Sequence, residues 1–292
     1  MTDLLHRPWT TGSSIRGSLF ALEARFAEQD DRRAIFATAY AWMTSSIDAQ
    51  IDAEVFDDPG WVVELTAVFA EYYRQALSEQ ARGGTSPRCW EIALEATDTV
   101  VLQDLLLGMN AHITYDLPLA LAELVGPLCR AQCLRDYRRI LTAIRGAIEI
   151  IQVQIVSRYA PGLRLLEHAF AGVDDWLTYH VIRLYREDAW RQGMLMIDHP
   201  QDRPELVAKI DAEAARRARW ILDLSRRPAF TWALHRVESF DLREHYARLS
   251  RGLSTTLTLP TWPFRLTPGE GASSKRRRGG RSDTAWAAKT LE

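Results

Sequence analysis

The fold of this chain is organised around residues 105–121, LLLGMNAHITYDLPLAL. The segment is apolar nearly throughout, and yet it contains Asn110, His112 and Asp116. An ionisable pair inside an apolar run is costly to bury unless each group finds a partner. Because His112 and Asp116 are four residues apart, they share one face of a helix, with Cβ atoms about 5–6 Å apart. This segment is therefore the best candidate for a functional site.

Apolar residues recur at helical spacing along most of the chain, and no stretch alternates convincingly between apolar and polar residues as strands do. The clearest helix start is Asp58 followed by Pro59, because aspartate caps a helix and proline fits its first position. Pro118 is expected to bend or break the helix that contains it. We predict an all-α fold, a single multi-helix bundle of about eight to ten helices. Helices are expected from residues 14 and 59 onward, and roughly over residues 32–54, 88–116, 118–130, 133–158, 163–171, 175–197, 202–225 and 238–250.

The domain organisation is simple. Residues 1–13 contain Pro8 and Gly12 and are expected to form a flexible arm. Residues 14–254 form the helical domain, since no repeat and no shift in composition divides them. In residues 255–292, prolines break the helical pattern and the run SKRRRGGRS follows, so we expect an irregular, extended and largely disordered basic tail.

Composition and charge exclude some classes of protein. The 292 residues suffice for a sizeable core, and a formal net charge of −2 argues against general nucleic-acid affinity. Three cysteines form no even disulfide framework and are expected to be reduced. We see no signal peptide and no apolar run of the ~18 residues that a membrane span needs. We therefore expect a cytoplasmic protein without a membrane span, with a homo-oligomer left as an alternative.

Three interpretations fit His112 and Asp116. An imidazole and a carboxylate one helical turn apart can both ligate a divalent metal (Zn²⁺, Fe²⁺ or Mn²⁺), if other helices supply the remaining ligands. The same pair can act as a general base, with the carboxylate fixing the tautomer of the imidazole. The third alternative is a buried hydrogen bond that fixes helix packing. Spacing alone does not decide among the three.

The helix expected over residues 32–54 offers further candidates. Tyr40, Thr44 and Asp48 form a polar line at i,i+4 spacing beside an apolar stripe. If this helix faces the central segment, Tyr40 is a catalytic candidate, Thr44 contacts the substrate and Asp48 is a third metal ligand. The alternative is the ordinary solvated face of an amphipathic helix.

The helix expected over residues 175–197 is the other polar region. There we assign His180 as a catalytic candidate, Arg183 as a clamp for a substrate carboxylate and Trp190 as a substrate contact. Asn110, in the central segment, is a further candidate for substrate binding. The alternative for this helix is a solvated face with intrahelical ion pairs.

The segment Leu107-Gly108-x3-His112-x3-Asp116 resembles the LG-x3-H-x3-D element of zinc-dependent phospholipase C-like proteins, which are all-helical. The match covers about ten residues. Those proteins also use a helical His-x3-Glu pair, and no histidine here has a glutamate four residues later. A trinuclear zinc centre and a phospholipase activity are therefore not implied.

A broader resemblance is to an uncharacterised bacterial family, a domain of unknown function found often in actinobacteria. It covers roughly residues 30–200. The motifs that carry it are Asp31-Arg32 with Phe36, Tyr40 and Thr44, Phe56-x-Asp58-x2-Trp61, GMNAHI-x2-DL over residues 108–117, Arg135-Asp136-Tyr137 and Arg186-x2-Ala189-Trp190. No catalytic residue of this family is defined, but the resemblance favours a functional role for the histidine and aspartate of the GMNAHI-x2-DL motif.

The leading hypothesis is a small-molecule enzyme with a His/Asp site in an aromatic-rich helical pocket, with or without one divalent metal. A hydrolase- or lyase-like reaction on an apolar substrate fits such a pocket, and the resemblance to a family found often in actinobacteria implies a tailoring step in secondary metabolism as its setting. The competing hypothesis is a non-catalytic helical module that binds an apolar ligand or a partner protein. Convergence of His112, Asp116 and one of Asp48, His180 or Tyr40 on a shared cavity would favour the enzyme.

Overall fold

The structure, a computed structural model, describes residues 5, 8–9, 12–126, 128–161 and 173–223. The chain divides into two units, residues 1–249 and 250–292, and the second lies outside the described residues. Every regular element in the described part is helical, which confirms the predicted all-α fold. The helices expected over 163–171 and 238–250, and the expected basic tail, lie outside the described residues.

Most helices begin and end close to their predicted bounds. Two short turns join them, the π-helical turn η1 (His112–Asp116) and the 3₁₀ turn η3 (Pro200–Asp202). The helices are α2 (Gly12–Glu28), α3 (Arg33–Asp52), α4 (Pro59–Arg82), α5 (Arg88–Glu95), α6 (Val101–Ala111), α7 (Leu117–Leu124), α8 (Arg130–Tyr159), α10 (Val173–Asp198) and α11 (Arg203–Asp223).

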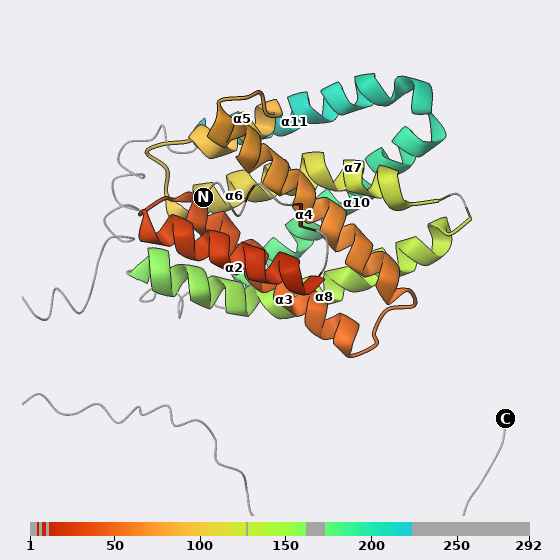
Figure 1. Cartoon of the computed structure of the whole chain (residues 1–292), viewed down its shortest axis with the longest axis horizontal. Coiled ribbons are helices and arrows are strands. Elements are labelled where there is room, and N and C mark those ends of the chain that lie inside the picture. Colours follow the sequence, from red (N-terminus) through yellow and green to blue (C-terminus); the bar gives the residue numbers. More distant parts are fainter. Residues whose placement is uncertain (1–4, 6–7, 10–11, 127, 162–172, 224–292) are drawn as a thin grey trace, which may run out of the picture. The chain divides into compact units, whose positions relative to one another are not determined.

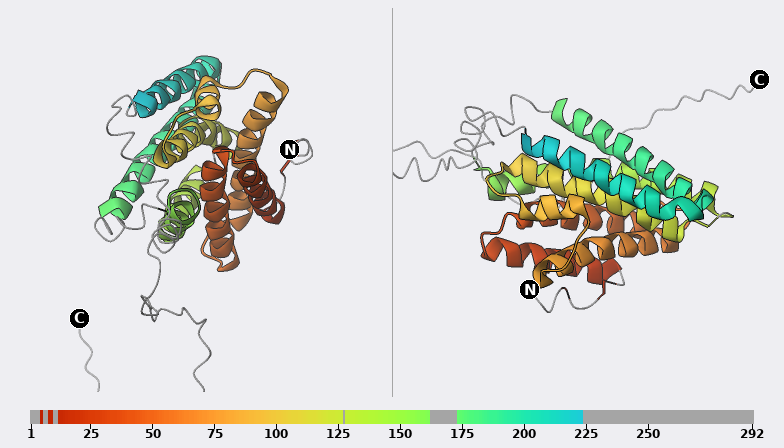
Figure 2. Two further views of the ribbon diagram at one scale, coloured as in Figure 1. Left: turned by 90° about the vertical axis from the view of Figure 1, so that its left-hand side faces the viewer. Right: turned by 90° about the horizontal axis from the view of Figure 1, so that it is seen from above.

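The segment formed by α6, η1 and α7 lies in the middle of these helices (Figures 1 and 2). Helices α3 and α4 pack against it on one side, and α10 and α11 pack against it on the other (Figure 2, right). Helix α2 lies against α3, and α8 runs along α3. The segment that carries the His–Asp pair is therefore enclosed by helices from distant parts of the sequence.

The chain leaves the helical conformation between α5 and α6, so the prediction of one helix over residues 88–116 is wrong. Asp98 has a φ of 55°, in the left-handed region that few residues other than glycine, asparagine and aspartate adopt. The chain becomes helical again at Val101, where the side chain of Gln103 accepts a hydrogen bond from the backbone N–H of Val100 at 3.1 Å. A turn at Asp98 thus separates α5 from α6, which the apolar pattern had predicted as one helix.

Pro118 does not break the central segment, because a π-helical turn precedes it. A proline has no N–H, and its ring crowds the carbonyl four residues earlier in an α-helix. In η1 the backbone N–H of Leu117 donates to the carbonyl of His112, five residues back, which widens the turn. The predicted bend or break is therefore replaced by a continuous helical path with a local π turn at the His112–Asp116 pair.

Carboxylates fix the start of α4. Asp58 accepts a hydrogen bond from the backbone N–H of Trp61 at 2.9 Å, which confirms the predicted cap. Asp136 of α8 is 0% exposed and accepts bonds from the backbone N–H groups of Asp57 (2.9 Å) and Asp58 (2.7 Å). These bonds satisfy backbone donors at the helix start and attach α4 to α8.

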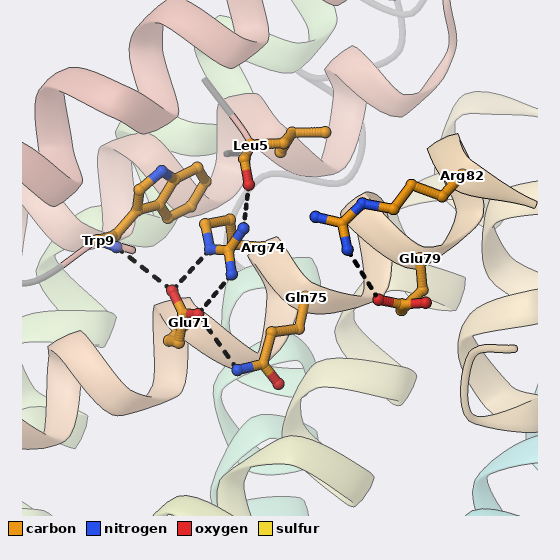
Figure 3. A network of polar contacts seen from close by, with 7 residues as sticks. All are labelled: Leu5, Trp9, Glu71, Arg74, Gln75, Glu79 and Arg82. Carbon is orange, nitrogen blue, oxygen red and sulfur yellow. Dashed lines mark hydrogen bonds and ion pairs between the residues drawn. The ribbon is translucent and has the colours of Figure 1, made fainter. Parts of the chain in front are cut away.

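Two of the described residues in the segment expected to be a flexible arm, Leu5 and Trp9, are held on α4 (Figure 3). The backbone N–H of Trp9 donates to Glu71 at 3.3 Å. Arg74 donates to the same carboxylate at 2.7 Å and also to the backbone carbonyl of Leu5. Leu5 and Trp9 are 3% and 4% exposed, so their side chains are part of the core of their own chain.

By length and composition alone, helix α8 is long and apolar enough to cross a membrane. From the sequence we had expected no such segment. In the structure α8 packs against α3 and α10, with Ile140, Ile144 and Ile148 buried. The core helix of a bundle passes the same test, so this single helix is weak evidence for a membrane span.

Helices α6 and α3 approach each other closely at Gly108. A Cβ atom added to Gly108 would lie 2.4 Å from Cγ and 2.8 Å from Cβ of Phe36. Phe36 is buried, and its ring meets the ring of His112 edge-on. The glycine therefore sets how near α3 comes to the candidate site.

We expect Gly108→Ala to lower the free energy of unfolding by about 1–3 kcal/mol, because the added methyl group overpacks a filled contact. Gly146→Ala is the matched control, because Gly146 lies on the exposed face of α8 and a Cβ there meets nothing within 4 Å. Alanine is the better helix former, so this control is expected to gain up to about 1 kcal/mol. Urea unfolding of both variants checks the prediction, and an unchanged Gly108→Ala protein would contradict it.

Candidate functional site

Three buried side chains are joined by hydrogen bonds at the π-helical turn. Nδ1 of His112 lies 2.8 Å from Oδ2 of Asp116. The indole N–H of Trp90, in α5, donates to the two carboxyl oxygens of Asp116 at 3.0 and 3.1 Å. His112 is 3% exposed and Asp116 is 1% exposed. The pair is therefore shielded from water and attached to a helix outside the central segment.

Burial decides the charge of this pair. It raises the pKa of Asp116 well above its usual range, although the hydrogen bond from Trp90 opposes the shift. It lowers the pKa of His112 well below its usual value. Both shifts favour the neutral forms of the two groups, because an isolated charge is costly in an apolar interior. In the neutral pair, Oδ2–H of Asp116 donates to Nδ1 of His112, and the imidazole proton lies on Nε2.

Several buried polar atoms near the pair have no hydrogen-bond partner among the residues that the structure describes. They include Nε2 of His112, the hydroxyl of Tyr40 and Oγ1 of Thr44. Tyr40 and Thr44 lie one turn apart on α3 and are 6% and 0% exposed. Buried polar groups in proteins nearly always have a partner. Such a group of unsatisfied atoms can take its missing hydrogen bonds from a bound molecule or from water.

These three residues line one cavity of about 320 Å³. Small-molecule sites have volumes of about 300–1,000 Å³, mostly apolar walls and a few polar groups. The walls come from α3, α4, α6, η1, α7, α8 and α10. The wall along α8 is formed mainly by the isoleucines Ile140, Ile144, Ile148, Ile151 and Ile155. The cavity therefore fits a small, largely apolar molecule.

Aromatic rings hold the imidazole in one orientation. Phe69 of α4 stacks on His112, with 3.5 Å between ring centroids and 7° between ring planes. The ring of Tyr40 lies 4.6 Å from that of His112, and the ring of Phe36 lies 5.8 Å from it. Because Nδ1 is held by Asp116, the opposite ring nitrogen, Nε2, is left for a molecule in the cavity.

The structure brings four of the predicted site residues together. Tyr40, Thr44 and His112 line the cavity, and Asp116 lies behind His112. The convergence expected of an enzyme is thus met in part, because Asp116 itself does not line the cavity.

The other predicted site residues do not line the cavity. Asp48 forms an ion pair with Arg16 at 3.3 Å, instead of approaching His112. Arg183 pairs with Glu187 at 3.0 Å on an exposed face of α10, as the alternative of a solvated face predicts. His180 is half-buried on the same helix.

Asn110 and Trp190 have packing partners instead. The side-chain amide of Asn110 donates to the backbone carbonyl of Ala214 at 2.8 Å and so joins α6 to α11. The ring of Trp190 lies 5.2 Å from that of Tyr137, between α10 and α8. Both residues hold helices together around the site without reaching the cavity.

The structure does not complete the predicted metal site. In the part of the chain that the structure describes, no group of three or more His, Cys, Asp or Glu side chains is placed to hold a metal ion. Nδ1 of His112 and both oxygens of Asp116 already take part in hydrogen bonds, which leaves Nε2 as the available ligand atom. One divalent metal at His112, Asp116 and Asp48 stays a prediction.

The sequence patterns did not identify Trp90, Phe69 and Arg186 as residues of the site. The two aromatic residues come from helices that no local pattern connects to the central segment. Arg186 lines the cavity, and it did carry a signal. Ile182, Arg186 and Ala189 follow one another at helical spacing and are all buried, so an arginine occupies an apolar helix face.

The fold and the site define an all-α helical protein with a buried His–Asp pair beside an apolar cavity. The model of a family of unknown function (DUF5995) matches residues 14–224, and the chain belongs to this family. The predicted membership of a family of unknown function is thus confirmed. No curated protein and no solved structure matches the chain.

We expect His112 to be neutral at pH 6.5, because burial lowers its pKa well below this usual value. Its proton is expected on Nε2. Long-range ¹H–¹⁵N correlation spectra across pH report both the charge and the tautomer. A ring that is charged at pH 6.5, or one with its proton on Nδ1, would contradict the neutral pair.

The variant Asp116→Asn is the control for this measurement. Its amide N–H can donate to Nδ1 of His112 as the protonated carboxyl does, so the spectrum should stay that of the Nε2–H tautomer. If Asp116 were ionised in the wild type, the substitution would instead move the imidazole proton from Nδ1 to Nε2.

Proposed function

We propose that the protein is an enzyme that transfers a proton to or from a small apolar molecule bound in the cavity, with His112 as the catalytic residue. The observation that supports this proposal best is the buried, unsatisfied Nε2 of His112, a residue that lines a cavity of about 320 Å³ and has Asp116 bonded behind it. The reaction is of the hydrolase or lyase class, and a tailoring step in secondary metabolism is its proposed setting.

His112 and Asp116 together can supply and recover one proton. When Nε2–H gives its proton to a substrate oxygen, Nδ1 takes the proton from Oδ2 of Asp116. The imidazole is then neutral again, Asp116 is a carboxylate, and Nδ1–H donates to Oδ2. The hydrogen bonds from Trp90 stabilise this carboxylate until the reverse transfer restores the pair.

The unsatisfied groups indicate a substrate with an acceptor oxygen such as a carbonyl. Nε2–H of His112 and the hydroxyls of Tyr40 and Thr44 can all donate hydrogen bonds. The apolar walls lower the local dielectric, and donors fixed in such surroundings act strongly on charge that develops on an oxygen. A neutral imidazole is known to polarise a carbonyl in this way.

A second candidate is non-catalytic binding of an apolar ligand in the same cavity. The near-complete burial of His112 and Asp116 favours it, because a pair that only fixes helix packing would be buried in the same way. Both candidates predict a ligand in the cavity. Only the enzyme predicts turnover that depends on His112.

Two probes separate these candidates: 4-nitrophenyl decanoate, whose hydrolysis releases 4-nitrophenolate, and 2-undecanone in D₂O, whose enolisation incorporates deuterium. We expect turnover of at least one probe, lowered about 10²–10⁴-fold by His112→Gln. Asp116→Asn keeps the hydrogen bonds but cannot release a proton, so it should slow the same reaction. Trp190→Phe, outside the cavity, is the control and should leave the rate unchanged.

Binding of both probes is followed in parallel by the shift in melting temperature. Probe binding with equal rates in the wild type and His112→Gln would overturn the enzyme and support the binding candidate. If neither probe is bound nor turned over, both candidates are overturned.

A further inference from the structure

Arg186 of α10 is a cationic side chain in the apolar interior. It is 6% exposed, and it lines the same cavity as His112 and Tyr40. Its guanidinium donates to the backbone carbonyl of Tyr137 at 3.0 Å and lies 4.1 Å from the centroid of the Tyr137 ring. The hydroxyl of Tyr137 in turn donates to the backbone carbonyl of Arg186 at 2.7 Å. These contacts hold the guanidinium in place between α8 and α10.

No carboxylate neutralises this charge in the described ranges of the chain. In the part of the chain that the structure describes, the guanidinium has one hydrogen bond, to the Tyr137 carbonyl, and one ring contact, with Tyr137, and neither partner carries a charge. The other arginines of α10 differ, because Arg183 and Arg191 are exposed and pair with acidic residues one turn away. Removing a charge from water without an opposite charge is costly, so buried cations are normally paired.

A guanidinium has five N–H donors in a planar fork, and one protein hydrogen bond is found here. The fork matches the two oxygens of a carboxylate, which it can bind through two parallel hydrogen bonds. Tyr137 holds the group on one side, and the cavity is the space that remains for such a partner.

We propose that the molecule bound in the cavity is an apolar chain that carries a carboxylate, and that Arg186 binds this carboxylate. The inference rests on the proposed function, because it names the substrate class of the same cavity. It assigns the role of carboxylate clamp to Arg186, in place of Arg183, which the sequence pattern had suggested. The isoleucines of α8 would contact the chain of the ligand, and His112 would face its reacting oxygen.

The test uses three probes with the same ten-carbon chain: decanoate, 1-decanol and decylamine. Each competes with the neutral fluorescent reporter N-phenyl-1-naphthylamine for the full-length protein at pH 8. We expect decanoate to displace the reporter at a concentration at least about tenfold lower than 1-decanol, as a desolvated charge-assisted pair implies. Decylamine should be the weakest competitor because its charge repels that of Arg186.

Substitutions test whether Arg186 is the source of this preference. Arg186→Gln should bring decanoate to the level of 1-decanol while the reporter still binds, and Arg186→Lys should keep part of the preference. Trp190→Phe is the control for loosened helix packing, because Trp190 packs between α10 and α8 without lining the cavity, and this variant keeps the guanidinium and the contacts of Arg186 with Tyr137. It should leave the order of the three probes unchanged.

The outcomes separate this inference from the proposed function. If the reporter binds and decanoate competes no better than 1-decanol, the carboxylate clamp is overturned and the cavity remains a site for neutral molecules. A preference for decanoate that survives in Arg186→Gln also overturns it. If neither the reporter nor any of the three probes binds the wild type, the proposed function and this inference both fail.

Discussion

The buried hydrogen bonds from Trp90 to Asp116 and from Asp116 to His112 are the constraint on which the site depends. In an apolar interior each polar atom needs a partner, and these bonds satisfy every polar atom of the two ionisable side chains except Nε2 of His112. The same bonds attach α5 to the central segment, and the stacked ring of Phe69 fixes the plane of the imidazole. The position of one ring nitrogen is thus determined by three helices together.

The cavity contains groups that stability alone does not explain. A tightly packed apolar core would be at least as stable as one with a buried His–Asp pair, unsatisfied hydroxyls and a cation without a carboxylate. Tyr40, Thr44, His112 and Arg186 all line one space, although they come from three helices. In the function proposed here, His112 transfers a proton at one part of this space, and the guanidinium of Arg186 binds the carboxylate of the ligand.

Local patterns predicted much of the fold and part of the site. Apolar residues at a period near 3.6 gave the all-α class and most helix bounds, and Asp58 with Pro59 gave the start of α4. The bond between His112 and Asp116 follows from their spacing on one helix. The errors lie where backbone geometry departs from an ideal helix. The period of the apolar residues does not predict the turn at Asp98. It also does not predict the π-helical turn that accommodates Pro118.

By itself the sequence determined the helical class, the amphipathic faces and the pairing of groups one turn apart, because these depend on contacts within one helix. Only the tertiary structure decided which faces meet around the cavity. It placed Tyr40 and Thr44 beside His112 but paired Asp48 with Arg16, and it turned Arg186 inward. The physical reason is that the helical repeat fixes which residues share a face, whereas the partner of that face is set by side-chain packing between helices far apart in sequence.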